Sequence, residues 1–139
     1  MRIRLFSIED SAAVIALWEA CGLTRSWNNP ELDIQRKLSV QPELFLVGEL
    51  DSRIIASAMA GYDGHRGAVY YLGVHPDYQR RGFGRQLMDD LEQRLFAMGC
   101  PKLNILIRSS NSKVIKFYEA LGYRGDDISC MGKRLIPDQ

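Results

Sequence analysis

Residues 74–85 read VHPDYQRRGFGR and are the most informative stretch of the sequence. Pro76 stops the apolar strand pattern that precedes it, and an amphipathic helix pattern follows the second glycine. Gly82 and Gly84 let the backbone approach a ligand closely, without a Cβ in the way. The start of the helix presents N–H groups without helical partners and the positive end of the helix dipole. These features predict an anion site suited to a pyrophosphate, and three side chains add positive charge around it: Arg80, Arg81 and Arg85.

Two glycines at a helix start are a weak signal by themselves, because a tight turn that lets the helix pack closely has the same pattern. No Gly-Lys-Ser/Thr sequence follows, which excludes a Walker phosphate loop. Leu87 stands where the dinucleotide fingerprint requires a third glycine. The loop therefore indicates phosphate binding outside the two commonest nucleotide-binding folds.

The strand before this loop has the sequence YYLGV at residues 70–74 and is apolar on both faces, as in a central strand. Gly73 weakens a strand interior unless it marks a bulge or the close approach of another chain or a ligand. A bulge there would splay the strand from its neighbour and free N–H and C=O groups in mid-sheet. An extended ligand with amides, such as the pantetheine arm of coenzyme A, could pair with those groups.

Two motifs resemble those of the GNAT superfamily of N-acetyltransferases. Residues 74–84 match V-x-P-x-x-Q-x-x-G-x-G, the acetyl-CoA-binding motif of that superfamily. Residues 111–123, NSKVIKFYEALGY, resemble its N-x-x-a-x-x-F-Y-e-x-L-G-F signature. The resemblance covers essentially the whole chain. It implies an α/β fold of mixed α+β type: a central, mixed, mostly antiparallel sheet of six to seven strands, splayed between strands 4 and 5 and flanked by four helices.

Apolar periodicity along the chain predicts elements in the same order as in the GNAT fold. We expect strands at residues 2–6, 44–50, 54–62, 68–75 and 103–107, and one or two short strands within 123–136. We expect helices after Ser7, at 31–38, at 82–98 and around 114–121. The length suits a single domain that spans residues 1–139.

The resemblance also implies roles for single residues. Backbone amides of the loop would bind the pyrophosphate, the backbone of two strand residues would pair with pantetheine, and Asn111 would bind the cofactor arm. The loop residues are Gln79, Arg80, Arg81, Gly82, Phe83, Gly84 and Arg85, and the strand residues are Leu72 and Val74. From the residues alone, Asn111 is equally suited to be a helix N-cap.

Tyr118 is the expected catalytic residue, because the resemblance places it near the thioester sulfur. From the residues alone, its position on the apolar stripe of a helix indicates a core aromatic. A tyrosine with a pKa near 10 is protonated at neutral pH, whereas a free thiol titrates near 8.5. Proton transfer from Tyr118 to the leaving thiolate is then uphill by about 2 kcal/mol. A hydrogen bond to the thiolate would help even without transfer.

The acceptor is expected to be a primary amine of a small molecule or a protein, and it must lose a proton before it attacks. This costs about 4 to 5 kcal/mol at pH 7 for a lysine but only about 1 kcal/mol for an α-amine. In the branch that acetylates ribosomal-protein N-termini, a glutamate lies twelve residues before the tyrosine, where this chain has Leu106. Asp63 and His65 are substitute bases, although ordinary hairpin chemistry also explains both. Residues 27–31 occupy the region that caps the acceptor site in relatives.

The composition argues against several kinds of partner and site. A net charge of +1 suggests no nucleic-acid or membrane-surface partner. Three widely spaced cysteines and two histidines indicate neither a disulfide framework nor a metal site, so acetyl-CoA is the expected co-substrate and no metal is expected. Without a signal-peptide pattern or an apolar run long enough to span a bilayer, we expect a cytoplasmic protein.

Two further points follow from the resemblance. Homodimers are common among GNAT proteins, so a homodimer is a compatible arrangement. The alternative to an enzyme is a catalytically silent GNAT domain that binds acyl-CoA as a sensor or interaction module. That alternative shares the phosphate loop and predicts no turnover.

Overall fold

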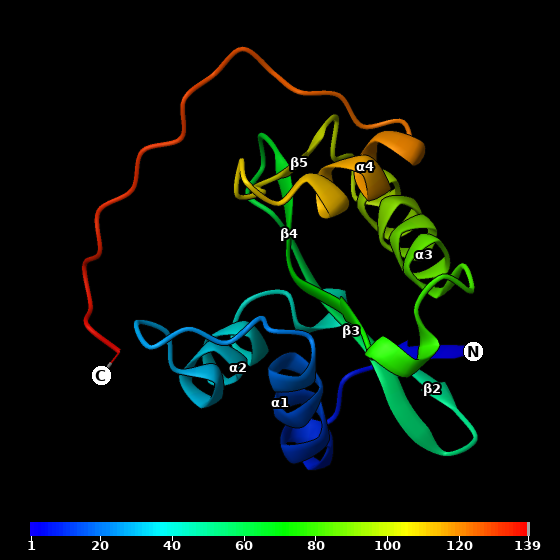
Figure 1. The fold of residues 1–139 in the computed structure, drawn as a ribbon. Coiled ribbons are helices and arrows are strands. Elements are labelled where there is room, and N and C mark those ends of the chain that lie inside the picture. The colour runs from blue at the N-terminus through cyan, green and yellow to red at the C-terminus, as the bar shows by residue number, and fades with distance from the viewer. Residues whose placement is uncertain (139) are drawn as a thin grey trace.

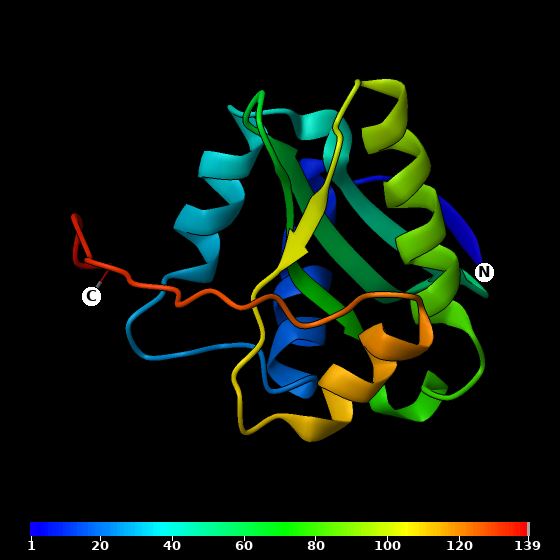
Figure 2. The same cartoon turned by 90° about the horizontal axis from the view of Figure 1, so that it is seen from above.

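The structure, a computed structural model, describes residues 1–138 and is built around one five-stranded sheet (Figures 1 and 2). The strands follow the order β1-β2-β3-β4-β5 across the sheet. They are β1 (Arg2–Leu5), β2 (Phe45–Leu50), β3 (Arg53–Tyr62), β4 (Gly67–Val74) and β5 (Leu103–Ile105). The pairs β1–β2, β2–β3 and β3–β4 are antiparallel, and β5 runs parallel to β4. The expected mixed, mostly antiparallel sheet is confirmed.

Two pairs of helices cover the two faces of this sheet (Figure 1). One face carries α1 (Ser11–Ala20) and α2 (Pro30–Leu38), and the other carries α3 (Phe83–Ala97) and α4 (Ser112–Ala120). Three short 3-10 helices join the elements: η1 (Ile8–Asp10), η2 (Pro42–Leu44) and η3 (Pro76–Tyr78). Across residues 1–138, none of the helices is long and apolar enough to cross a membrane.

Each face of the sheet has its own apolar core. The α3/α4 side buries Leu46, Ile55, Leu87 and Leu91 among other residues. The α1/α2 side buries Phe6, Val14, Trp18, Ile34, Phe45, Val47 and Met59. Leucines four apart on α3 therefore face the sheet, as the helical periodicity predicts. The indole of Trp18 also donates a 3.0 Å hydrogen bond to the buried hydroxyl of Ser57, so this core has its polar group satisfied.

Local capping explains where the helices begin. The backbone N–H of Ser7 donates to the carboxylate of Asp10 at 2.8 Å, which supports the expected capping at the start of the first helical region. Asn29 accepts a hydrogen bond from the N–H of Leu32 and caps α2, and Pro30 occupies its first position. The predicted start at residue 31 was therefore one residue late.

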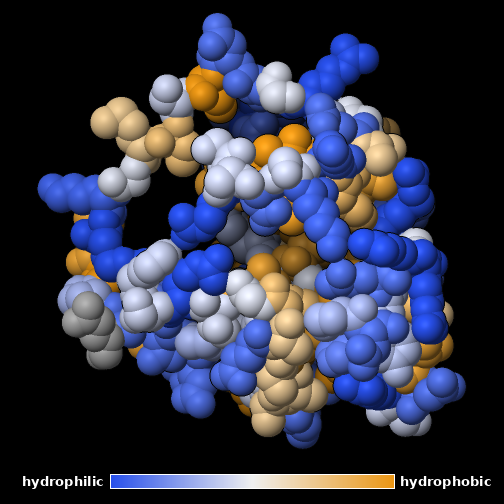
Figure 3. All heavy atoms as spheres, in the orientation of Figure 1, coloured by the Kyte–Doolittle hydropathy of each residue, from blue (hydrophilic) through white to orange (hydrophobic). Residues whose placement is uncertain are grey.

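The prediction of one or two strands within residues 123–136 is wrong for the described chain, which explains five strands in place of the expected six to seven. We call residues 124–138 the C-terminal segment. It leaves the end of α4 and arches outward, and a gap separates it from the body of the molecule (Figures 1 and 3). Apolar residues on it, such as Ile128 and Met131, are exposed. An alternating pattern becomes a strand only when a neighbouring strand pairs with it, and none does so within residues 1–138.

Candidate active site

Strands β4 and β5 separate half-way along β4. They pair at only three positions, Gly67↔Leu103, Ala68↔Asn104 and Val69↔Ile105. Beyond Val69, the remainder of β4 has no β5 partner among residues 1–138. The expected splay between strands 4 and 5 is therefore present, and it leaves one edge of residues 70–74 open in mid-sheet.

The splay coincides with a bulge, although not at the predicted residue. The register between β3 and β4 shifts between Met59↔Tyr70 and Ser57↔Gly73, so two residues of β4, Tyr71 and Leu72, oppose one residue of β3. Tyr71 has a φ of 54°, in the left-handed region. The bulge therefore begins at Tyr71, two residues before Gly73, the residue at which the sequence predicted it.

Gly73 has a different role. A Cβ added to it would lie 3.0 Å from Cδ1 of Leu23 and 3.1 Å from Sγ of Cys21. Distances this short require a neighbour to move, so Gly73 allows the end of α1 to lie close against β4. The close approach at Gly73 is made by another part of the same chain, whereas the sequence suggested a bulge or the approach of another chain or a ligand.

The bulge residue Tyr71 is held by contacts on the α1/α2 side. Its ring stacks on Trp18 with centroids 3.9 Å apart, and its hydroxyl donates to Oδ2 of Asp33 at 2.6 Å. A non-glycine residue at positive φ costs about 1 to 2 kcal/mol, which these contacts offset. Burial, together with the Asp33 carboxylate, raises the pKa of Tyr71. The sequence pattern does not predict this role of Tyr71, because the role depends on contacts with distant segments.

The loop after β4 presents free backbone amides. Gly82, at φ 82°, is the N-cap residue of α3, and the N–H of Gln86 donates to its carbonyl at 3.0 Å to begin the helix. The amides of residues 83–85 precede that bond and have no partner within the helix. No atom lies within 4 Å of a Cβ built on Gly82, and the first turn of α3 has no acidic residue. The positive end of α3 is therefore open to an anion.

Gly84 has a packing role beside this loop. A Cβ on Gly84 would lie 3.0 Å from the ring of Phe117, so the missing side chain lets α3 and α4 approach each other. The guanidinium of Arg85 donates to the carbonyl of Ala120 at 3.2 Å, near the C-terminal end of α4. Arg85 thus joins the two helices in this structure. Both contacts bring the phosphate loop and α4 together.

The side chain of Gln79 joins the loop to the end of β4. Its amide donates to the carbonyl of Val74 at 2.9 Å, and the thiol of Cys21 donates to the same oxygen at 3.3 Å. Two donors occupy the acceptor capacity of that carbonyl. Leu72 lies in the bulge on the open edge of β4. Of the two strand residues predicted to pair with an extended ligand, Leu72 is therefore better placed in this structure.

The remaining arginines of the loop are exposed. Arg80 has a φ of 65° and is, after Tyr71, the second non-glycine residue in the left-handed region in this part of the chain. The guanidinium of Arg81 lies over the ring of Tyr78, 5.4 Å from its centroid, and Arg53 lies 5.7 Å from the same centroid. Positive charge therefore gathers beside the free amides of α3.

Tyr118, on α4, faces a cavity of about 1150 Å³. The cavity lies between β5, α4 and the beginning of the C-terminal segment, and Ile105, Ile107 and Ile128 also line it. Tyr118 is 5% exposed, and its ring contacts those of Phe117 and Tyr123 edge-on. Its hydroxyl makes no hydrogen bond to any residue within 1–138, and burial raises its pKa. The ring is part of the core, as periodicity predicted, and the hydroxyl remains available for a ligand.

Comparison with known proteins identifies the family of this site. Residues 10–123 match the Acetyltransferase (GNAT) family. A Yersinia pestis protein named as an acetyltransferase is 57% identical over 139 residues, which cover 100% of this chain and 99% of that protein. A Sodalis glossinidius protein, also named as an acetyltransferase, is 54% identical with the same coverage. The chain belongs to the GNAT acetyltransferase family.

Solved structures of GNAT N-acetyltransferases share this fold. The ribosomal-protein-S18-alanine N-acetyltransferase from Escherichia coli has a TM-score of 0.73 at 24% identity, over 87% of this chain and 76% of that one. The aminoglycoside antibiotic 6'-N-acetyltransferase from Acinetobacter haemolyticus also has a TM-score of 0.73, at 17% identity, over 98% of this chain and all of that one. Both comparisons concern the fold alone.

Two further candidate residues, Asn111 from the GNAT resemblance and Asp63 as a substitute base, have structural roles. Asn111 caps α4, because its side-chain oxygen accepts from the N–H of Val114 at 3.3 Å. Its amide group is exposed and remains free to donate. Asp63 accepts from the N–H groups of His65 and Arg66, at 2.8 Å each, and these bonds lower its pKa. A carboxylate with a lowered pKa is a weaker base, so the structure favours the turn interpretation of Asp63.

Leu106, at the position where the sequence offers no base, is apolar and accessible. Leu106 follows β5 directly, is 59% exposed and lines the cavity that Tyr118 faces. Trp27, in the connection between α1 and α2, is half exposed, and the guanidinium of Arg108 lies 5.6 Å from its ring centroid. The contact joins the α1–α2 connection to the segment after β5, on opposite sides of the splay.

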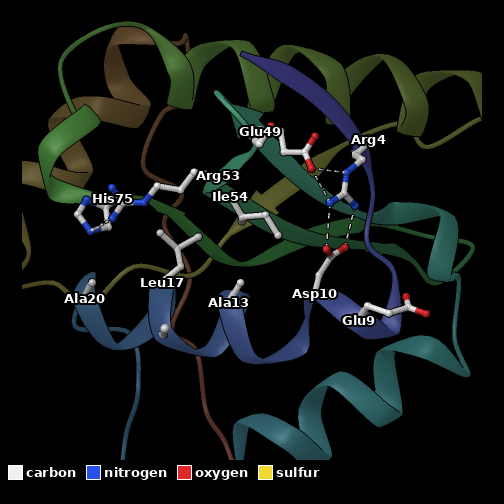
Figure 4. A pocket seen from close by; sticks show the side chains of 12 residues that line it. Arg4, Glu9, Asp10, Ala13, Leu17, Ala20, Glu49, Arg53, Ile54 and His75 are labelled. Carbon is white, nitrogen blue, oxygen red and sulfur yellow. Dashed lines mark hydrogen bonds and ion pairs between the residues drawn. The ribbon is translucent and has the colours of Figure 1, made fainter.

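A second cavity, of about 500 Å³, lies between α1 and the β2–β3 hairpin (Figure 4). Arg4 lies at its wall and donates to Asp10 at 2.7 and 2.9 Å and to Glu49 at 2.9 Å. These charges satisfy one another, and neither Tyr118 nor Gly82 lines the cavity. The open strand edge, the bulge and the free amides lie instead at the splay, which is therefore our candidate for the active site.

Proposed function

We propose that this GNAT protein transfers the acetyl group of acetyl-CoA to a primary amine by direct attack in a ternary complex. One structural relationship carries the proposal. The edge of β4 beyond Val69 has no β5 partner within residues 1–138, and β4 leads into the helix start with free amides at Gly82. Helix α4, which carries Tyr118, packs against that helix start through Phe117 and Gly84. An extended ligand with a pyrophosphate at one end and a reactive group at the other fits such an arrangement.

The residues present suit acetyl-CoA. The amides of residues 83–85 would bind its pyrophosphate, because they point outward from the positive end of α3. The backbone of Leu72, in the bulge, would pair with the amides of pantetheine, and the free amide group of Asn111 would donate to the same arm. Acetyl-CoA supplies the acetyl thioester, and the chain supplies binding, orientation and a proton donor.

Tyr118 would donate a hydrogen bond to the departing sulfur. In the reaction the amine nitrogen forms a bond to the acetyl carbon, the carbon–sulfur bond breaks, and the sulfur leaves with the electron pair. Burial raises the pKa of Tyr118, which makes full proton transfer to the thiolate more uphill than for a free tyrosine. Tyr118 therefore acts mainly as a hydrogen-bond donor that stabilises the developing negative charge. The proton released by the amine can then neutralise the thiolate through solvent.

The acceptor would be an amine that loses its proton easily. Leu106 stands at the position of a base in the ribosomal branch, and backbone hydrogen bonds hold the carboxylate of Asp63 in a turn. Deprotonating an α-amine at pH 7 costs about 1 kcal/mol, against about 4 to 5 kcal/mol for a lysine. We therefore expect a small or terminal amine to be acetylated faster than a lysine side chain.

The experiment has two stages. Acetyl-CoA at about 100 times its dissociation constant should stabilise the protein by about 2.7 kcal/mol, which a thermal-shift assay detects. Release of coenzyme A is then followed with spermidine, L-lysine amide and tetrapeptides that begin with alanine, serine or methionine. Binding with release supports the proposal. Binding without release from any of these amines would instead support a sensor or interaction module, and no binding of acetyl-CoA would contradict both.

A further inference from the structure

The C-terminal segment is exposed along its length and buried at its far end. Ile128, Met131 and Leu135 are 74%, 93% and 86% exposed, whereas Asp138 is only 7% exposed. A buried carboxylate is costly unless a partner compensates for its lost hydration. The last described residue is therefore held by a specific contact, while the chain before it is not packed.

That contact is a bidentate ion pair with α2. The two guanidinium nitrogens Nη1 and Nη2 of Arg36 donate to the two carboxylate oxygens of Asp138 at 2.7 and 2.9 Å. A fork of two charge-assisted bonds fixes the direction of both groups, which a single bond does not. Arg36 also lies 3.4 Å from Asp33, the residue that accepts the hydrogen bond of Tyr71. The anchor thus connects to the bulge of β4.

Two other contacts position the segment. Near its start, Lys102 pairs with Asp126 at 2.6 Å, beside β5. Further on, Arg134 donates to the side chain of Asn28 at 2.8 Å, in the connection between α1 and α2. With both ends fixed, the chain between them has far fewer conformations than a free tail. The segment therefore spans from β5 to α2.

This path crosses the acceptor side of the splay. The start of the segment lines the cavity that Tyr118 faces, through Gly125, Ile128 and Cys130. Its end lies against α2, beside the Asp33–Tyr71 hydrogen bond. Figure 1 shows the segment passing outside both β5 and the α1–α2 connection, and Figure 3 shows an opening beneath it. An amine that enters the cavity lined by Tyr118 from the side of Gly125, Ile128 and Cys130 would pass beside the segment.

We propose that Arg36 and Asp138 are positioning residues that hold the C-terminal segment across the acceptor side, where it forms the outer wall of the acceptor site. The inference rests on the proposed acetyl transfer. The wall limits the directions from which an amine reaches the open edge of β4. Neither Arg36 nor Asp138 directly contacts the residues proposed to bind acetyl-CoA, and Arg36 reaches the bulge of β4 only through Asp33. We therefore expect their loss to act mainly on the acceptor.

The test uses Asp138→Asn, Arg36→Gln and the exchanged pair Arg36→Asp with Asp138→Arg. Asp90→Asn is the matched control, because it removes a carboxylate from an ion pair with Arg94 on the exposed side of α3. Each variant is assayed with the amine that the wild type acetylates fastest. Trypsin cleavage at Lys133 and Arg134 reports whether the segment is released, and a thermal shift reports acetyl-CoA binding.

Both single variants should be cleaved faster than the wild type and should raise KM for the amine by about tenfold or more, equivalent to about 1.4 kcal/mol of lost binding. Their kcat and the thermal shift that acetyl-CoA produces should stay close to the wild-type values. The exchanged pair should recover part of the lost KM, and Asp90→Asn should match the wild type. An unchanged KM in single variants whose segment is released would overturn the inference and leave acetyl transfer intact. Absence of turnover in the wild type would overturn the proposed function, and the inference with it.

Discussion

The hydroxyl of Tyr71 donates a 2.6 Å hydrogen bond to Asp33, which fastens the bulge of β4 to helix α2. Asp33 also contacts Arg36, and Arg36 binds Asp138 near the end of the chain. One line of polar contacts therefore runs from the strand that opens the sheet to the segment that covers the opening. The two sides of the candidate acceptor site are coupled through α2.

Replacing Tyr71 with phenylalanine tests whether the hydrogen bond to Asp33 stabilises the bulge of β4. The ring would keep its stacking on Trp18, and the variant would lose the hydrogen bond to Asp33. A bond to a charged group contributes about 1.5 to 3 kcal/mol, so thermal unfolding should show a lower Tm. Tyr70→Phe is the matched control, since Tyr70 is an exposed neighbour without a side-chain hydrogen bond in the described chain, and its Tm should stay near wild type. Equal Tm values for the two variants would show that the Asp33 bond does not hold the bulge.

Gly82→Ala tests the anion site at α3. An alanine at φ 82° costs about 1 to 2 kcal/mol and places a methyl group beside the free amides. Gly99→Ala is the control, because Gly99 follows the other end of α3 at φ 86° and likewise has no atom within 4 Å of an added Cβ. Both variants should lose similar stability. Only Gly82→Ala should also lose most of the thermal shift with acetyl-CoA, and an equal loss in Gly99→Ala would place the cofactor elsewhere.

The pH dependence of turnover tests the protonation state of Tyr118. The hydroxyl donates only while it is protonated, and burial raises its pKa above the usual value, so the donor persists to higher pH than in a free tyrosine. The amine becomes more reactive as it loses its proton. We therefore expect kcat/KM to rise from about pH 7 to about pH 10 without a falling limb, since an unperturbed tyrosine would begin to ionise near pH 10. A fall in kcat/KM that begins below about pH 9.5, with folding unchanged, would contradict this.

The sequence predicted those parts of the site whose geometry is local. Gly82 ends a turn and begins a helix within a few residues, so its pattern indicates its role without any knowledge of the sheet. The pairing of Asn111 with Val114 is local in the same way. The bulge was misplaced because it depends on which residues of β3 face β4, and the sequence of β4 alone favoured the glycine.

The C-terminal segment shows which features the sequence does not predict, namely those that depend on residues far apart in the chain. The apolar residues Ile128 and Met131 suit a strand, but the sequence does not show whether a neighbouring strand lies within reach. Arg36 and Asp138 are 102 residues apart and have no local pattern that pairs them. The charges that position the acceptor side were therefore visible only in the folded chain.

The most direct measurement compares wild type with Tyr118→Phe in an assay that counts both coenzyme A and the acetylated amine by mass spectrometry. Phenylalanine keeps the ring contacts with Phe117 and Tyr123, so stability and acetyl-CoA affinity should change little. Acetyl transfer with Tyr118 as the hydrogen-bond donor predicts equal amounts of the two products in the wild type. It also predicts a kcat about 10- to 10⁴-fold lower in the variant, with KM nearly unchanged. An unchanged kcat in Tyr118→Phe, or coenzyme A released without any acetylated amine, would contradict it.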